Sequence, residues 1–126
     1  MIQSKELRLG NYVKDGIYGF PKYVCAIGND WIYLDFNGNE SDIWECDEKD
    51  LEPITITDEL LLKFGFEQCD YLFKTLLIEM YEVANGWNLH IDNEKFETVL
   101  STTIKYVHQL QNAYYISTGE VLKIQL

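Results

Sequence analysis

Hydrophobic and polar residues in the first half of the chain alternate in part over short runs. Gly10, Gly16, Gly19, Gly28 and the pair Asn37-Gly38 lie between or beside these runs. Short β-branched and aromatic runs bounded by such turn residues are typical of half-buried strands. The expected strands are LRLGNYVK, YVCAIG, WIYLDF and DIWEC, with a tight turn at Asn37-Gly38. Their number and spacing predict a small SH3-like β-barrel as an N-terminal lobe, residues 1–56.

A short helix is expected next, in the segment TITDELLLKFGFE. Thr57 is a suitable N-cap, and Asp58 and Glu59 lie in the first turn, where the helix dipole favours negative charge. Gly65 supplies the left-handed residue that ends a helix, with Phe66 folding back on Leu60 or Leu61. The pattern predicts a structural brace against a sheet.

The remainder of the chain returns to strands before a last helix. LLIEMYEV and WNLHID alternate around Ala84-Asn85-Gly86, which predicts a hairpin, and Phe96 to Ile104 adds a strand. A helix over 106–119 and a final strand at VLKIQL complete the chain. The predicted fold class is α+β, with lobes 1–56 and 57–126 forming one compact unit.

The predicted last helix, YVHQLQNAYYISTG, contains no Asp, Glu, Lys or Arg in fourteen residues. One side presents a core stripe: Val107, Leu110, Ala113, Tyr114 and Ser117. The other side presents uncharged hydrogen-bonding groups, which we take as the candidate binding residues: His108, Gln111, Asn112, Tyr115 and Thr118. Burial of an amide or hydroxyl costs little when its hydrogen bonds are met, whereas burial of a lone charge costs several kcal/mol. The missing charges therefore indicate that both sides are covered.

Three kinds of cover are consistent with this pattern. The protein's own sheet and loops are favoured, because buried polar side chains usually bond to nearby backbone. Another protein or a second copy of the chain also fits, since interfaces are rich in Tyr and poor in charge. A pocket for a small ligand with amide-like or hydroxyl groups is the third.

The excess of acidic over basic residues favours some classes of binding partner over others. Acidic residues outnumber basic ones 21 to 10, and no basic tract exists, which disfavours nucleic-acid binding. Basic partners and small uncharged ones fit better. From Glu40 to Glu52, seven carboxylates stand against Lys49 alone. A cation site or a surface for a basic partner is one interpretation; a solvated edge strand whose charges discourage pairing is favoured. A calcium loop starting at Asp35 fails, because Glu40 stands where glycine is required.

Catalytic and cofactor chemistry has no positive signal in the sequence. Cys25, Cys46 and Cys69 form no CxxC pair and have no zinc-ligand spacing to His90 or His108. There is no nucleophile elbow, phosphate loop or metalloprotease motif. We expect no enzyme activity, no catalytic residues, no metal and no cofactor. An odd number of cysteines and an N-terminus, MIQSKELRLG, without the apolar run of a secretion signal predict a cytoplasmic protein. No apolar run approaches the roughly 20 residues of a membrane span, so we expect no membrane contact.

Three stretches together carry a resemblance: LRLGNYV, PITITDELLLKFGFE and YVHQLQNAYYISTGEVL. The combination, which spans nearly the whole chain, resembles a family of small uncharacterised proteins of Bacteroidetes genomes, prophages and phages. The resemblance implies an accessory protein of a phage or mobile element and assigns no catalytic residues.

Three functions follow as hypotheses. The leading one is a non-enzymatic binder of a host or phage protein, including an inhibitor of a host or defence protein. The first alternative is an oligomer that sequesters a nucleotide-like small molecule. The second is a structural module associated with virions.

Overall fold

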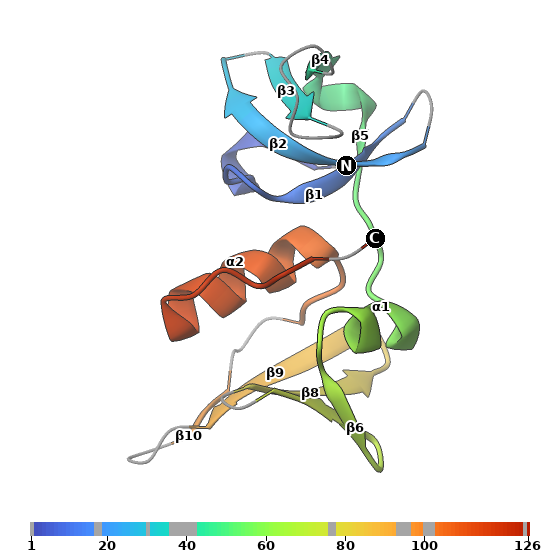
Figure 1. Cartoon of the computed structure of the whole chain (residues 1–126), viewed down its shortest axis with the longest axis vertical. Coiled ribbons are helices and arrows are strands. Elements are labelled where there is room, and N and C mark those ends of the chain that lie inside the picture. The colour runs from blue at the N-terminus through green and yellow to red at the C-terminus, as the bar shows by residue number, and fades with distance from the viewer. Residues whose placement is uncertain are drawn as a thin grey trace. The chain divides into compact units, whose positions relative to one another are not determined.

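The computed structural model describes residues 2–16, 19–29, 31–35, 43–75, 78–92, 97–99, 103–124 and 126. The chain divides into two compact units, Met1–Ile54 and Thr55–Leu126, and each is described by itself (Figure 1). The fold is α+β, with a curled antiparallel sheet, a second antiparallel sheet and a C-terminal helix. Among the described residues, no helix is long and apolar enough to span a bilayer.

The N-terminal unit is built on a five-stranded antiparallel sheet that curls into a half-barrel. Its strands are β1 (Tyr12–Asp15), β2 (Pro21–Ile27), β3 (Trp31–Asp35), β4 (Ile43–Asp47) and β5 (Leu51–Glu52). They lie in the order β4-β3-β2-β1-β5. Of two 3-10 turns, η1 (Ser4–Glu6) precedes β1 and η3 (Glu48–Asp50) links β4 to β5. The four strands expected in this half are confirmed as β1 to β4; the turn expected at Asn37-Gly38 lies outside the described residues.

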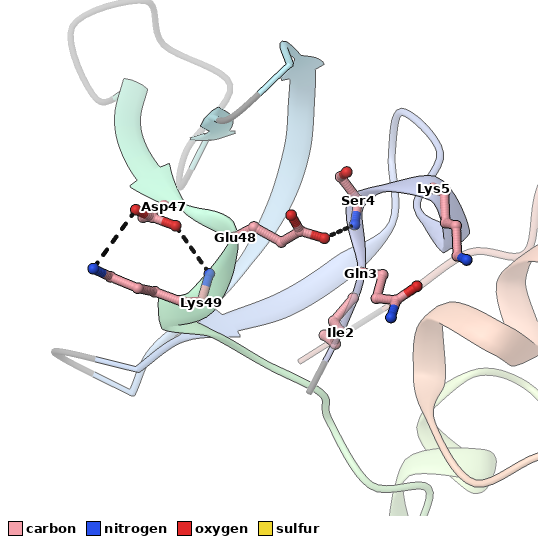
Figure 2. A pocket seen from close by; sticks show the side chains of 7 residues that line it. All are labelled: Ile2, Gln3, Ser4, Lys5, Asp47, Glu48 and Lys49. Atoms are coloured by element: carbon pink, nitrogen blue, oxygen red, sulfur yellow. Dashed lines mark hydrogen bonds and ion pairs between the residues drawn. The ribbon is translucent and has the colours of Figure 1, made fainter.

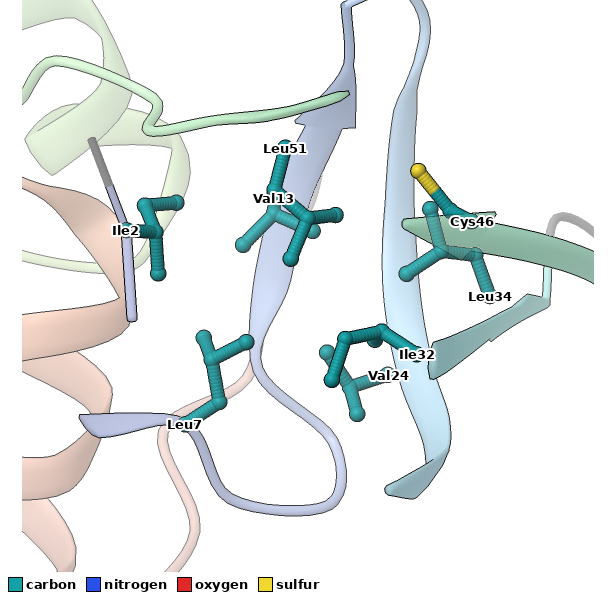
Figure 3. Close-up of a cluster of buried hydrophobic side chains, with 8 residues drawn as sticks. All are labelled: Ile2, Leu7, Val13, Val24, Ile32, Leu34, Cys46 and Leu51. Atoms are coloured by element: carbon teal, nitrogen blue, oxygen red, sulfur yellow. The ribbon is translucent and has the colours of Figure 1, made fainter. Parts of the chain in front are cut away.

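The inner face of this sheet forms the core of the unit (Figure 3). Its buried side chains are Ile2, Leu7, Val13, Val24, Ile32, Leu34, Cys46 and Leu51. Every second residue of a strand points to the same face, so the alternation in the sequence selects this set. Complete burial of one such Leu or Ile side chain contributes about 1.5–3 kcal/mol.

Gly16 allows β1 and the segment before β5 to approach closely. Its N–H donates to the Asp50 carbonyl at 2.5 Å. A Cβ on Gly16 would lie 2.7 Å from the same oxygen. Any larger residue would therefore push the last strand away from the first.

The C-terminal unit contains a second five-stranded antiparallel sheet. Its strands are β6 (Glu67–Cys69), β7 (Leu72–Lys74), β8 (Ile78–Val83), β9 (Gly86–Asp92) and β10 (Glu97–Val99). Their order, β10-β9-β8-β7-β6, makes a simple meander. The predicted hairpin around residues 84–86 is confirmed, because Val83 pairs with Gly86 across the turn.

Helix α1 (Asp58–Lys63) begins and ends at the predicted residues. The Thr57 hydroxyl accepts the N–H of Leu60 at 3.2 Å. Gly65 has a φ of 92°, and the Phe66 N–H donates to the Leu61 carbonyl at 3.0 Å. Leu61 and Phe66 are both buried, as expected for the apolar side of a brace.

The predicted helix without charged residues is confirmed as α2 (Val107–Thr118). Its start is capped by Gln109, whose Oε1 accepts the N–H groups of Lys105 and Tyr106 at 2.9 and 3.1 Å. Its end is set by Gly119 in the left-handed region, φ 75°. The predicted final strand is wrong: residues 121–124 and 126 belong to no strand. Leu122, Ile124 and Leu126 alternate with Lys123 and Gln125 as in a strand, but alternation alone does not supply a sheet edge for the run to pair with.

The strand expected from Phe96 to Ile104 is found only in part. Strand β10 covers Glu97–Val99, and Ile104 forms a separate bridge with Trp87. Residues 93–96 and 100–102 are outside the described part of the chain.

Candidate functional site

The outward face of β3 and β4 carries apolar side chains paired with carboxylates. Three cross-strand pairs make this face: Trp31 with Asp47, Tyr33 with Glu45, and Ile43 with Asp35. Directly opposed side chains in an antiparallel pair have Cβ atoms about 4.5–5.5 Å apart, so each pair is in contact range. We call these six residues the β3–β4 strip.

The parity of the strands explains why the strip faces outward. Ile32 lies opposite Cys46 and Leu34 opposite Trp44, and Ile32, Leu34 and Cys46 belong to the buried core. Their neighbours along each strand must point the other way. A slip of one residue would bring the carboxylates into the core, so burial of Ile32 and Leu34 enforces the register.

Large apolar groups of the strip are open to solvent. Trp31 is 45% exposed and Ile43 is 43% exposed. Glu45, which lies opposite Tyr33, is also exposed. Its Oε1 accepts a hydrogen bond from the Tyr33 hydroxyl at 3.4 Å. Asp47 lies 3.9 Å from the exposed ammonium of Lys49. Aromatic faces and carboxylates together attract Lys or Arg, whose alkyl stems pack on rings while the charge meets the carboxylate.

Two tyrosines extend the aromatic character of this face onto β1 and β2. Tyr12 lies opposite Tyr23, with ring centroids 5.7 Å apart and ring planes at 54°. Desolvation by burial and then the hydrogen bond with Asp35 raise the pKa of Tyr23 above its ordinary value of 10.0. The strip therefore adjoins a hydrogen-bonded aromatic surface.

The inner face holds an ion pair that serves the fold. The Lys22 ammonium lies 3.0 Å from Asp15 Oδ2, and the two side chains are 9% and 0% exposed. The same ammonium lies 4.8 Å from the centre of the Trp44 ring. Removal of either charge would leave the other buried and uncompensated. Because Lys22 already has an acidic and an aromatic neighbour, it is a poor source of charge for an anionic ligand.

Cys46 lies on the same inner face. Burial, followed by the charges of Asp50 and Asp15, raises the pKa of its thiol from 9.0 to about 11. A thiol with so high a pKa is protonated near neutrality and is a weak nucleophile.

A cavity of about 370 Å³ lies beside η1 and η3 in the N-terminal unit (Figure 2). It is lined by Ile2, Gln3, Ser4, Lys5, Asp47, Glu48 and Lys49. Glu48 Oε1 accepts the Ser4 N–H at 2.5 Å, and Asp47 Oδ1 accepts the Lys49 N–H at 3.1 Å. Both carboxylates thus accept hydrogen bonds from backbone N–H groups of the cavity wall, so their first role is structural.

A second cavity, of about 350 Å³, lies in the C-terminal unit before α2. It is lined by Thr55, Ile56, Glu82, Asn85, Gly86, Trp87, Lys105 and Tyr106. Backbone pairing joins its walls, because Trp87 and Ile104 exchange hydrogen bonds of 2.7 and 2.8 Å. Gly86 has a φ of 143°, and a Cβ there would lie 2.6 Å from the Ile104 carbonyl oxygen, so only glycine fits this close approach.

The five candidate residues of α2 do not share one environment. His108 and Gln111 are buried, Asn112 and Thr118 are half-buried, and Tyr115 is 48% exposed. The His108 ring stacks on Tyr106, with centroids 5.9 Å apart. None of the five lines either of the two cavities described above. Their role as a binding surface stays a prediction.

Thr118 has a local role at the end of α2. Its hydroxyl donates to the Tyr114 carbonyl at 2.8 Å and accepts the Glu120 N–H at 3.1 Å. Gln109, which is not among the five candidate residues, has the matching role at the start of the helix. Its position three residues after the N-cap is the signal of a capping side chain.

Metal binding finds no support in the part of the chain that the structure describes. There, no group of three or more His, Cys, Asp and Glu side chains is placed to hold an ion. His90 is near one acid, with its Nδ1 3.8 Å from Glu79 Oε2.

Comparison with known proteins finds no matching family model, no matching curated protein and no matching solved structure.

Proposed function

We propose that this chain is a non-enzymatic binding protein that engages a partner protein through the β3–β4 strip. The observation that carries the proposal is the exposure of Trp31, Ile43 and the carboxylate of Glu45 on one face of β3 and β4. Exposed aromatic side chains are enriched at protein interfaces, and solvated sheet faces are otherwise mostly polar. The acidic character of the chain favours a basic surface on the partner.

The context of this activity is also a proposal. The resemblance of the sequence to small Bacteroidetes phage and prophage proteins supports an accessory role inside the host cell. A binder of this size acts by occupying a surface of a host or phage protein. Inhibition of a defence protein is the form we propose first.

We further propose that the N-terminal unit is an SH3-like barrel. Support comes from β5, which follows the 3-10 turn η3 and pairs with the edge of β1 that faces away from β2. Barrels of this kind commonly present aromatic side chains to extended partners.

The test uses tagged protein expressed in a Bacteroidetes host and examined by native mass spectrometry after gentle capture. We expect the wild-type chain to carry one partner protein at fixed stoichiometry. Trp31→Ala with Ile43→Ser should remove that partner. The matched control is Leu62→Ser, because Leu62 is as exposed, but on α1. Equal loss of the partner in the control, or a bare chain in the wild type, would contradict the proposal.

A second candidate function is sequestration of a small molecule in the cavity before α2. Its volume of about 350 Å³ is within the usual range for ligand sites, roughly 300–1,000 Å³. Lys105 supplies the positive charge that an anionic ligand needs, and Tyr106 and Asn85 supply hydrogen bonds. A small adduct in the same mass spectra, lost on Lys105→Ala and retained on Lys63→Ala, would favour this function.

A further inference from the structure

Strand β4 forms one edge of the N-terminal sheet. In the described sheet, the order β4-β3-β2-β1-β5 gives it β3 as its neighbour on one side. Its first three residues, Ile43, Trp44 and Glu45, are exposed although they alternate between faces. An edge strand turns half of its backbone donors and acceptors away from its own sheet and is a template for another strand.

The side chains of β4 determine which kinds of strand could pair with its free edge in the described sheet. The strand sequence, IWECD, has neither the Pro nor the Lys that commonly blocks an edge. On its outward face, Ile43 is followed by Glu45 and Asp47. A second copy of β4 would bring carboxylates close together, and like charges on paired strands are destabilising. A strand with basic residues would instead form opposite-charge pairs.

We propose that β4 receives an extended basic segment of the partner protein as a sixth strand. The inference rests on the proposed function and names the chemistry of that partner. The segment places an apolar residue beside Ile43 and Lys or Arg beside Glu45 and Asp47. Since side chains on one face recur about every 6.6–6.8 Å, these residues occupy alternate positions of the segment.

The opposite face of β4 defines the remaining positions of the segment. Trp44 points to that face and is 37% exposed, which leaves part of its ring available for contact. The intervening residue of the segment is therefore apolar and packs on the Trp44 ring. Main-chain hydrogen bonds supply affinity in this mode of binding, and the alternate side chains supply specificity.

The charge of the whole unit assists the encounter. Residues 1–54 contain eleven acidic and five basic side chains. A field of this sign attracts a basic segment before it docks, and salt weakens the attraction. Affinity should therefore fall as ionic strength rises.

The test uses a fluorescent seven-residue peptide of alternating Val and Lys, with the intact chain and anisotropy as the readout. Control peptides replace Lys by Glu, or place all Lys in one block. We expect the alternating Lys peptide to bind at least about tenfold more tightly than either control. Hydrogen exchange of the β4 amides should slow by about tenfold or more on binding, because a paired edge exchanges through local opening.

Variants of two edge strands make the matched comparison. Glu45→Lys should weaken the Lys peptide about tenfold and favour the Glu peptide. Glu67→Lys makes the same charge change on β6, an exposed edge of the other sheet, and should leave binding unchanged. Equal effects of the two variants would show general charge attraction and overturn the inference.

Two further peptides are N-methylated at every Lys or at every Val, so each lacks the backbone donors of one edge. One of the two should lose binding if the segment is added as a strand, because an added strand pairs with β4 through one edge. Binding of both as tight as that of the parent peptide, or unprotected β4 amides, would overturn strand addition. Loss of peptide binding while the host partner is still captured through Trp31 and Ile43 would overturn this inference alone and leave the proposed function standing.

Discussion

Helix α2 and the β3–β4 strip depart from an ordinary surface in opposite ways. The helix has polar side chains without charge, and its first half is buried: Val107, His108, Leu110 and Gln111. The strip has apolar side chains beside charges, and its Trp31, Ile43 and Glu45 are exposed, whereas Tyr33 and Asp47 are half-buried and Asp35 is buried. Polar groups in a buried helix contribute to a unique fold when their hydrogen bonds are met. Apolar side chains exposed to water do not contribute to the fold in this way, so the strip is the better candidate for binding.

The comparison also separates the two halves of α2. Buried residues end at Gln111, and Tyr115 in the third turn is half exposed. Burial therefore explains the absence of charge in the first half of the helix only. In the second half, Tyr115 and Ile116 are exposed, and burial does not account for the absence of charge.

The largest expected effect tests which side chains of β4 point into the core, because the outward position of the strip depends on that orientation. Cys46 points inward with a pKa of about 11, whereas an ordinary thiol has 9.0, so its thiolate fraction at pH 8 is roughly a hundredfold lower. Labelling with a thiol reagent should be slower by about tenfold or more at the buried Cys46 than at the exposed Cys69. Single-cysteine variants followed by mass spectrometry give the two rates. Equal rates would mean that Cys46 does not face the core.

The same thiol gives a pH dependence of stability. Because its pKa is higher in the folded state, its contribution is complete below pH 9 and is lost as pH rises through about 11. Wild-type protein should lose more stability over that range than Cys46→Ala. A parallel decline in both would contradict the pKa shift.

An intermediate effect is expected within α2. Gln111→Ala should lower the free energy of unfolding by about 1–3 kcal/mol, because it leaves buried partners unsatisfied. Tyr115→Ala, at an exposed position, should change it by no more than about 0.5 kcal/mol. Urea unfolding measures both. If Gln111→Ala is as mild as Tyr115→Ala, the polar side of the helix is open, and a ligand or partner there regains support.

The smallest effect is expected for the strip itself. Trp31→Ser and Glu45→Gln should each alter the free energy of unfolding by about 0.5 kcal/mol or less, as surface substitutions do. Ile32→Ala, one residue away on the buried face, should cost about 2–5 kcal/mol. Guanidinium unfolding of the three variants makes the comparison. A large loss at Trp31 would assign the strip to stability and remove the main support for binding.

Local signals predict both helices, the strands β1 to β4 and the β8–β9 hairpin, but neither β5 nor β6. Thr57 and Gly65 mark the ends of α1, and Ala84-Asn85-Gly86 predicts the hairpin turn before Trp87. These signals succeed because caps and turns depend on neighbours in sequence. The final strand failed for the complementary reason: an apolar run becomes a strand only where a sheet edge accepts it.

The candidate site was less accessible from sequence. The acidic run from Glu40 to Glu52 mainly predicts a solvated turn and edge strand, with a cation site or a surface for a basic partner as the weaker interpretation. What the sequence alone lacked was the cross-strand partner of each carboxylate. Trp31 and Asp47 are sixteen positions apart, and no local pattern pairs them.

The sequence by itself determined the class of the fold, the alternation of inward and outward side chains in strands such as β1 and β2, and the absence of charge in α2. Those properties follow from side-chain type and from periods of two or 3.6 residues. Only the tertiary structure decided which polar residues of α2 are buried, which strand forms an edge, and which carboxylate lies beside which ring. Burial and pairing arise from contacts between distant segments, and these contacts place Trp31, Ile43 and Glu45 on one open face.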